Sequence, residues 1–575
     1  FTPLAFLSGV TGGFFKALAL TIAACLIISF FVAYLAVPLL ADVWLRNVRE
    51  RPESHWMIWL QSGYEHLLGV LLRRSQYAVY SIVLVLAIGG IAYTQVGSGF
   101  LPRMDEGGFV LDYKAAPSTS LAETDRLLTQ VEHILAKTPD VDTWSRRTGL
   151  QLGGGITGDN TGDFFVRLKT DRHRSVWQIM ARVRREIAEQ VPGLQIDTDQ
   201  LMEDLIGDLT AVPQPIEIKI FGGKEQTLES VAKTIATTIR EVPGVVEVRD
   251  GITIAGDAVE VRINPVKTAL EGMSPGQVIA QLKTLMDGDI VSRIPRGEET
   301  LALRVTSRGR NWSQIGRLRH LFIQAPDGHW FPLQRIALIR IVKGQPQLRE
   351  ENLKPMIAVT ARIEGRSMGG AVQAVQERVA GLHFQKGVYI AYGGLYREQQ
   401  QAMRDLSLVL GAAVLLVAAL LLFLYERFLI VITILTTVAL ATCGVFVGLW
   451  VTSTELNISA MIGMTMIIGI VTETAIFYFA ELRCADHIGT DDLVKAGRNR
   501  LRPILMTATI AIMALFPLAL GLGAGAQMQA PLAIAIISGL TLEIPLVLLI
   551  MPAIYAALQT LFFRTAIRSE PPRKS

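Results

Sequence analysis

Seven apolar runs in this chain are long enough, or nearly long enough, to cross a lipid bilayer as helices. A helix rises 1.5 Å per residue, so about 20 consecutive apolar residues span the hydrocarbon core. The chain is 50% hydrophobic with a mean hydropathy of +0.38, more apolar than soluble globular proteins usually are. The sequence therefore predicts a polytopic membrane protein. The runs are Ala17–Leu40, Tyr77–Val96, Leu406–Leu424, Leu429–Val451, Ile458–Phe479, Met506–Leu522 and Leu532–Leu558.

The charge and cysteine content exclude several other classes. Charged residues make up 18% of the 575 residues and the formal net charge is +4, which does not indicate a nucleic-acid-binding protein. Cys25, Cys443 and Cys484 lie far apart, within or beside apolar runs. We interpret them as small apolar side chains and predict neither a disulfide nor a metal site from them. No cofactor is predicted.

The distribution of Lys and Arg predicts the orientation of the spans. Basic residues collect in three segments, 46–74, 483–502 and 564–574. The positive-inside rule places these segments in the cytoplasm, and alternating spans then place the large polar stretch on the opposite side. The chain begins at Phe1 with FTPLAFLSGV, which has the character of the end of a span. We expect it to be part of a longer protein.

The polar stretch of about 300 residues between the second and third runs repeats a strand–helix–strand pattern. Four such rounds form two split β-α-β units of the ferredoxin-like type. The fold class expected is an α-helical polytopic membrane bundle with a large α/β insert. The expected organisation is spans and an interfacial helix at 1–97, a first subdomain at 98–214, a second subdomain at 215–256 and 351–397, an insertion at 257–350, and the remaining bundle with its tail at 398–575.

Motifs for phosphate binding, zinc-dependent hydrolysis or redox chemistry are absent from the sequence. The Gly-rich run LQLGGGITGDNTGD at 150–163 lacks the G-x-x-x-x-G-K-[ST] pattern and does not open a helix, so it indicates a connection between strands. The motifs H-E-x-x-H and C-x-x-C do not occur, and the His residues are scattered. The sequence therefore does not indicate an enzyme.

An acidic residue lies within the fifth apolar run, in IIGIVTETAIFYFAE. Glu473 is flanked by Thr472 and Thr474. An Asp at a membrane helix centre costs about 2.5–3.5 kcal/mol on insertion scales, so an intramembrane acid is a functional candidate. Glu473 is interpreted as a reversible proton carrier. The alternative is a permanently protonated Glu that hydrogen-bonds to a neighbouring helix.

Three further residues are candidates for the same proton relay. Glu543 lies at membrane depth just before Pro545, where it is either a functional acid or a structural partner of the carbonyls that the proline leaves free. Arg500 and Thr507, in RNRLRPILMT, enter the sixth run from the cytoplasmic side. Arg500 either anchors the helix at the interface or supplies the positive charge that an ionised Glu473 would pair with.

Several motifs resemble those of the resistance–nodulation–division (RND) efflux permeases. They are RLRPILMT, the TELN link before IIGI, the elbow FLPRMDEGGF and the opening FTPLAFLSGVTGGFFKALALTIA. The resemblance covers essentially the whole chain and corresponds to the C-terminal half of such a pump, preceded by the last spans of the N-terminal half. It implies a homotrimer in the bacterial inner membrane, with periplasmic porter subdomains and a docking-domain insertion. It also implies a periplasmic adaptor protein and an outer-membrane channel as partners.

The resemblance assigns roles to individual residues. Arg500 and Thr507 fall on family positions of the proton relay, and Glu473 falls where drug exporters carry Lys and copper and silver exporters carry Glu. Met273 matches one member of the copper exporters' three-methionine cluster, and Gly207 and Asp327 occupy the other two positions. Because Cu(I) prefers thioether sulfur, a copper substrate is not expected. A harder divalent cation and an organic amphiphile are the alternatives.

The function expected is proton-driven efflux of organic amphiphiles or metal cations, with a heavy-metal-specific permease as the alternative. Two other classes fit less well. A secretion-accessory membrane protein would have a smaller extramembrane part than the doubled unit in this chain. A sterol-sensing receptor would carry a disulfide-rich luminal domain, whereas the insert contains no Cys.

Overall fold

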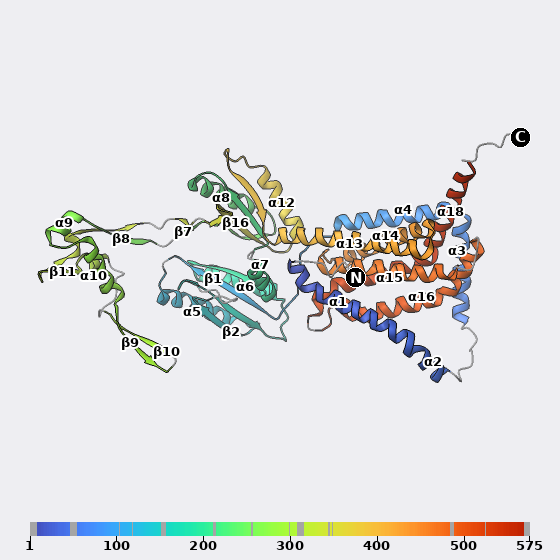
Figure 1. Cartoon of the computed structure of the whole chain (residues 1–575), viewed down its shortest axis with the longest axis horizontal. Coiled ribbons are helices and arrows are strands. Elements are labelled where there is room, and N and C mark those ends of the chain that lie inside the picture. Colours follow the sequence, from blue (N-terminus) through green and yellow to red (C-terminus); the bar gives the residue numbers. More distant parts are fainter. Residues whose placement is uncertain are drawn as a thin grey trace.

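The computed structural model forms an elongated molecule with a helical bundle at one end, two α/β subdomains in the middle and a smaller unit at the far end (Figure 1). The order of these parts follows the polarity of the sequence, because the apolar helices gather together and the polar insert projects from them. The residues described are 9–45, 55–102, 104–117, 119–150, 157–210, 214–254, 257–297, 299–306, 315–342, 346–347, 349–482, 488–523 and 525–568.

The bundle contains the predicted membrane spans. Within the described residues, seven helical stretches are long and apolar enough to cross a membrane, as the sequence predicts. Helix α15 lies at the centre of the bundle and packs against α14, α16 and α17 (Figure 1). The bundle helices are α1 (Gly9–Phe31), α2 (Val37–Leu45), α3 (His55–Arg73), α4 (Ser75–Gln95), α13 (Leu395–Tyr425), α14 (Phe428–Val451), α15 (Ile458–Glu481), α16 (Thr490–Ala519), α17 (Ala526–Pro545) and α18 (Met551–Arg568).

The last span bends at Pro545, as its missing N–H group requires. The helix changes to π geometry at Leu546–Ile550 directly after the proline. The Tyr64 hydroxyl of α3 donates a 2.9 Å hydrogen bond to the Leu548 carbonyl within that segment. Helix α3 therefore helps to satisfy the irregular backbone, which would be costly to leave unpaired in an apolar bundle.

The first α/β subdomain has a four-stranded antiparallel sheet in the order β2-β3-β1-β4. Helices α5 and α6 pack on one face and contribute the core, and Ser120 and Ser175 cap their N-termini. This is the predicted ferredoxin-like arrangement. Its elements are β1 (Gly108–Ala115), α5 (Leu121–Lys137), β2 (Val141–Thr148), β3 (Thr161–Leu168), α6 (Val176–Gln190), β4 (Leu194–Asp199) and α7 (Leu201–Thr210).

The second subdomain repeats the topology with strands from both sides of the insertion. Strand β16 pairs with β5 and β6, and β17 pairs with β5. Helices α8 and α12 provide its core together with the inward side chains of the sheet. Its elements are β5 (Ile216–Phe221), α8 (Glu225–Arg240), β6 (Val245–Arg249), β15 (Arg349–Glu351), β16 (Lys354–Ile363), α12 (Met368–Ala380) and β17 (Tyr389–Gly393).

The insertion forms the far end of the molecule and has a small core of its own (Figure 1). Strands β8 and β13 pair along its connection to the second subdomain, and β9 and β10 form a projecting hairpin. Its elements are β7 (Thr253–Ile254), β8 (Ala258–Ile263), α9 (Pro265–Leu270), α10 (Pro275–Asp287), β9 (Asp289–Arg296), β10 (Glu299–Val305), α11 (Ile315–Arg319), β11 (Phe322–Gln324), β12 (Trp330–Pro332), the 3-10 turn Leu333–Arg335, β13 (Ala337–Val342) and β14 (Pro346–Gln347).

Candidate functional site

Two of the candidate acids in the membrane part lie beside each other on α15 and α17. Glu543 is 2% exposed, and its carboxyl lies close to the Thr474 side chain and the Glu473 carboxyl. Its second oxygen, Oε2, has no hydrogen-bond partner among the described residues. The close packing of α15 on α17 thus brings Glu473 and Glu543 together, although 70 residues separate them in sequence.

The environments of these two acids differ. Glu543 is enclosed by the bundle, whereas Glu473 lies on an exposed face of α15. The burial expected for Glu473 is therefore not provided by the described helices of this chain. A carboxyl group at this depth needs a further polar or protein surface against it, because contact with lipid would be unfavourable.

Arg500 and Thr507 do not contact these acids in the structure. Arg500 pairs with Glu481 at the end of α15, with 2.8 Å from Nη2 and 3.1 Å from Nε to Oε2. Pairing of Arg500 with Glu473, one of the two alternatives for Arg500 from the sequence, is therefore not found in this structure. Thr507 is exposed and its hydroxyl donates to helix carbonyls at Pro503 and Ile504.

The two metal candidates lie in the insertion, apart from the subdomain that holds Gly207. Met273 is 5% exposed and packs into the insertion's apolar core. Asp327 lies on its surface, where His329 is 2.5 Å from its Oδ1 and 2.9 Å from Glu271. Gly207 is in α7 of the first subdomain. The structure thus does not assemble the three positions into a cluster, and Met273 acts as a core residue.

Three aspartates lie side by side on the first sheet, a feature absent from the sequence prediction. Asp163, Asp112 and Asp197 are direct cross-strand partners on β3, β1 and β4, and we call them the aspartate row. They lie on the face opposite α5 and α6, since Phe109, Leu111 and Tyr113 of β1 point into the core and Asp112 alternates with them.

An arginine forms an ion pair with the aspartate at each end of the aspartate row. Arg147 of β2 forms a two-point pair with Asp163, at 2.7 and 2.5 Å. At the other end, Arg249 of the second subdomain approaches Asp197 Oδ1 to 2.7 Å. Burial, and then the nearby aspartates, including both neighbours in the row, raise the pKa of the central Asp112 to about 7. The centre of the row therefore favours a proton or another cation near neutral pH.

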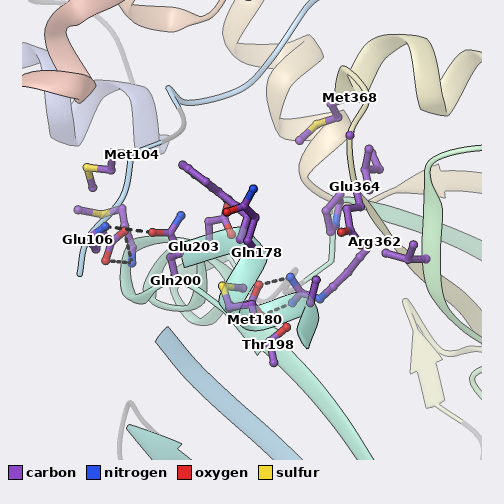
Figure 2. Close-up of a pocket in the computed structure, with 18 of the residues that line it drawn as sticks. Met104, Glu106, Gln178, Met180, Thr198, Gln200, Glu203, Arg362, Glu364 and Met368 are labelled. Carbon is purple, nitrogen blue, oxygen red and sulfur yellow. Dashed lines mark hydrogen bonds and ion pairs between the residues drawn. The ribbon is translucent and has the colours of Figure 1, made fainter. Parts of the chain in front are cut away.

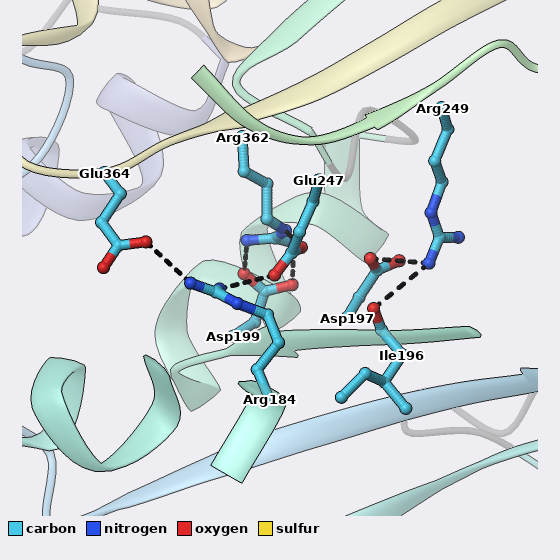
Figure 3. Close-up of polar contacts among 8 residues, drawn as sticks. All are labelled: Arg184, Ile196, Asp197, Asp199, Glu247, Arg249, Arg362 and Glu364. Atoms are coloured by element: carbon cyan, nitrogen blue, oxygen red, sulfur yellow. Dashed lines mark hydrogen bonds and ion pairs between the residues drawn. The ribbon is translucent and has the colours of Figure 1, made fainter. Parts of the chain in front are cut away.

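A group of charges centred on buried Asp199 and Arg362 joins the two subdomains, and Figure 3 shows its arrangement. Arg362 of β16 forms a two-point ion pair with Asp199 of β4, and its Nε lies 3.1 Å from Glu247 Oε2 without hydrogen-bond geometry. Arg184 of α6 bridges Glu247 at 2.6 Å and Glu364 at 2.7 Å. We call these five residues the interdomain cluster.

Two acids of the interdomain cluster, Asp199 and Glu247, have raised pKa values. Burial raises the pKa of Asp199 to about 6 and that of Glu247 to about 7, against the attraction of Arg362. Glu247 also has a φ of +50°, beside an irregularity in the pairing of β6 with β16. Such a backbone is unfavourable for a non-glycine residue and is often found at functional positions.

A pocket of about 920 Å³ opens beside this cluster, between the two subdomains and the membrane bundle (Figure 2). Four methionines line it, together with Phe100 and Trp177. The pocket also contains charged side chains of both signs, among them Glu106, Glu203 and Arg362. The methionines are Met104, Met180, Met202 and Met368.

The elbow after α4 connects the pocket to the bundle. The Asp105 N–H donates a 2.7 Å hydrogen bond to Gln527 of α17, and Glu106 accepts the N–H of Met202 at 3.1 Å. The TELN link lies against the same segment, since the Leu456 N–H donates to the Gly97 carbonyl at 2.8 Å. Two motifs that are distant in sequence thus form one junction.

No group of three or more His, Cys, Asp or Glu side chains among the described residues is arranged to hold a metal ion. Arg147 and Arg249 form ion pairs with the carboxylates at the ends of the aspartate row, and Arg362 forms an ion pair with Asp199. A cation would have to replace these arginines as the partner of the acids. Oxygen ligands of this type suit divalent cations better than Cu(I).

A family model described as the AcrB/AcrD/AcrF family matches residues 1–559. The chain is 26% identical over 576 residues to the cobalt-zinc-cadmium resistance protein CzcA of Cupriavidus metallidurans, covering 96% of this chain and 54% of that protein. It is 24% identical over 588 residues to the multidrug resistance protein MdtC of Pectobacterium carotovorum, covering 100% of this chain and 56% of that protein.

A solved structure has the same fold. The crystal structure of a heavy metal efflux pump superposes with a TM-score of 0.84 at 23% identity, over 97% of this chain and 56% of that one. The chain spans about half the length of the curated relatives that it matches. The fold class predicted from the sequence is confirmed, as is the resemblance to the RND permeases.

Proposed function

The chain belongs to the AcrB/AcrD/AcrF family of RND transporters, and from that premise we propose that it works within a proton-driven efflux permease that exports divalent metal cations. The observation that carries the choice of substrate is the aspartate row, with Asp112 at its centre. Hard oxygen ligands bind divalent cations, and Asp carboxylates are also Zn²⁺ ligands. Relatives named for cobalt, zinc, cadmium and nickel resistance support this choice.

In the proposed cycle, the cation and the arginines compete for the same carboxylates. In the structure the second subdomain supplies Arg249 and Arg362 to Asp197 and Asp199 of the first. Separation of the two subdomains would withdraw both arginines and leave Asp197 and Asp199 available to a cation beside Asp112, while Arg147 of the first subdomain would stay paired with Asp163. Their return would neutralise the acids again and release the cation. Only the arginine-paired arrangement is favourable without substrate, because unpaired buried charges are costly.

Protons would drive this movement through the acids of the bundle. Glu473 and Glu543 form the pair at which protonation can change the packing of α15 on α17. Arg500, now held by Glu481, and Thr507 would take part in the same relay as the helices shift. The longer relatives have a second half that could supply the polar surface which exposed Glu473 needs.

The assembly proposed follows the family. The permease would lie in the bacterial inner membrane as a homotrimer, with the two α/β subdomains and the insertion in the periplasm. The insertion, at the far end of the molecule, would meet a periplasmic adaptor protein and an outer-membrane channel. Met273 and Asp327 lie in this insertion, and they would act there in structure rather than in binding a cation.

Export of organic amphiphiles is the second candidate, and the pocket in Figure 2 favours it. Methionine and aromatic side chains give this pocket an adaptable apolar lining with charged groups at its edge. The relative MdtC is named for multidrug resistance. The two substrate classes would use different parts of the same interdomain region.

A susceptibility test of cells that lack the gene, complemented with the complete protein, separates these candidates. Export of divalent cations predicts restored tolerance to Zn²⁺, Co²⁺ or Ni²⁺ and loss of this tolerance with Asp112→Asn. Export of organic compounds predicts restored tolerance to cationic dyes or detergents, sensitive to Trp177→Ala and Met180→Ala instead. Unchanged metal tolerance in the Asp112→Asn strain would exclude the aspartate row as the cation site.

A further inference from the structure

A second cavity lies where two membrane helices end, and the proposed function does not use it. It has a volume of about 960 Å³ and lies between the end of α4 with the turn after it, the start of α12 and the first turns of α13. Its lining is rich in amide groups, from Gln95, Gln373, Gln376, Gln399 and Gln400. Such a lining is suited to a polar ligand that forms hydrogen bonds.

One of these amides is buried with an unsatisfied oxygen. Gln399 is 3% exposed, and its Oε1 has no hydrogen-bond partner among the described residues. Two neighbouring amides donate elsewhere, since Gln400 Nε2 donates to the Tyr396 hydroxyl at 2.7 Å and Gln373 Nε2 donates to Glu377. Buried acceptors without a donor are rare in folded proteins. An N–H or O–H donor on a bound molecule would satisfy this oxygen.

The cavity lies at the depth of the membrane surface. Its walls include the ends of two candidate spans, Gln76–Gln95 and Leu395–Tyr425. Arg404 also lines it, one to two turns after Gln399 and just before the apolar run of α13, about 7.5 Å along the helix axis. Arg404 forms no ion pair within the described part of the chain. Outward along α13, the apolar run that begins at Leu406 is followed by Asp405, then by the cation Arg404 and then by the buried acceptor of Gln399.

Apolar surface continues from this cavity into the membrane. Ile91 and Leu84 of α4 and Leu408 and Leu415 of α13 are all more than half exposed. Acyl chains can lie against such residues, while a basic side chain at the interface attracts a lipid phosphate. Arg404 and Gln399 follow each other along α13 in the order of the phosphate and the hydrogen-bond donor of a phospholipid headgroup.

We propose that this cavity binds the headgroup of a phospholipid that carries a hydrogen-bond donor. The phosphate lies at Arg404, and the amine or hydroxyl group beyond it donates to Gln399 Oε1. Phosphatidylethanolamine and phosphatidylglycerol both carry such a donor. Phosphatidylcholine does not, because its quaternary ammonium has no N–H. The lipid would hold α4 and α13, the two spans that flank the α/β subdomains, at a fixed separation.

Native mass spectrometry of the complete, delipidated protein tests this proposal by titration with each of the three lipids. We expect phosphatidylethanolamine and phosphatidylglycerol to bind about tenfold more tightly than phosphatidylcholine, the effect of one buried hydrogen bond. Equal binding of all three lipids would overturn the proposal. So would equally tight binding of glycerophosphoethanolamine, a soluble headgroup without acyl chains, because the ligand would then not be a membrane lipid.

Variants of α13 assign the effect to Gln399. Gln399→Leu should lower the affinity for both donor lipids to that for phosphatidylcholine, whereas Gln401→Leu, an exposed neighbour outside the cavity, should leave all three unchanged. Gln399→Glu keeps the size and polarity of the side chain and should shift the preference toward the cationic amine of phosphatidylethanolamine. An unchanged lipid preference in Gln399→Glu would contradict the assignment even if the Leu variant failed to fold.

Discussion

Arg362 and Asp199 lie on facing sheets of different subdomains and form a two-point ion pair in which both residues are less than 10% exposed. Breaking a buried pair by removing one partner leaves the other charge buried and typically costs about 3–5 kcal/mol. Arg362→Gln should therefore lower the free energy of unfolding of the subdomain region by about this amount. Thermal unfolding of the purified complete protein would measure the change.

The control for this variant is an exposed ion pair in the second subdomain. Arg378 lies 3.4 Å from Glu241, and both side chains are more than half exposed. Exposed pairs contribute about 0–1 kcal/mol, so Arg378→Gln should have little effect. Equal destabilisation by the two variants would show that the buried pair does not join the subdomains.

The raised pKa of Asp112 predicts a pH dependence of stability. The folded protein holds a proton on Asp112 up to about pH 7, whereas the unfolded chain releases it near pH 3.8. Between these values the folded state binds more protons, so this group's contribution to stability falls as the pH rises. Asp112→Asn should change the melting temperature little at pH 4 and raise it at pH 8, in buffer with a metal chelator. The same increase at both pH values would contradict the assignment.

The sequence predicted the architecture because that level of organisation depends on local patterns. Apolar runs define the membrane spans, and alternation between strand and helix patterns defines the two ferredoxin-like subdomains. Pro545 likewise predicted an irregular helix, which the structure shows as a π segment. These features depend on residue type and spacing within short windows.

The aspartate row and the interdomain cluster could not be predicted in this way. Asp112 meets Asp163 and Asp197 through strand register, which depends on turns and core packing far from these residues. Arg362 meets Asp199 across 163 residues of sequence. A signal existed only in the alternation of strand β1, which places Asp112 on the face opposite the core.

Met273 shows why residue type alone does not assign a role. Its thioether makes it chemically suitable as a soft-metal ligand, but the same side chain is also a common core residue. Position in the fold decides between the two roles. The structure places Met273 in the apolar core of the insertion, apart from the subdomain that contains Gly207.

Substitutions of Glu473 on α15 and of Glu543 on α17 should have different effects on transport. Glu473→Gln removes the ionisable group and should abolish export by the complete protein, with expression and oligomeric state unchanged. Glu543→Gln should reduce export, because its carboxyl interacts with Thr474 and lies near Glu473. Asp491→Asn, at the exposed start of α16, is the matched control and should export normally. Proton-driven cation uptake into inverted membrane vesicles measures these rates, and normal uptake by Glu473→Gln would remove this residue from the mechanism.

The packing of α14 on α17 predicts that small residues are required between these helices. Gly444 and Gly448 lie one turn apart on α14, and a side chain at either position would overlap α17. A Cβ at Gly444 would lie 2.9 Å from Leu542, and one at Gly448 would overlap Ser538. Small residues at this spacing let membrane helices approach closely.

Gly448→Val should therefore separate α14 from α17 and destabilise the bundle by about 1–3 kcal/mol, the usual effect of overpacking. Gly411→Val is the matched control, because this glycine is also within a membrane helix but a Cβ there has no atom within 4 Å. Both variants lose the same glycine flexibility, so the difference between them reports packing alone. Thermal unfolding of the two purified proteins measures it, and equal melting temperatures would show that the close contact between α14 and α17 does not stabilise the bundle.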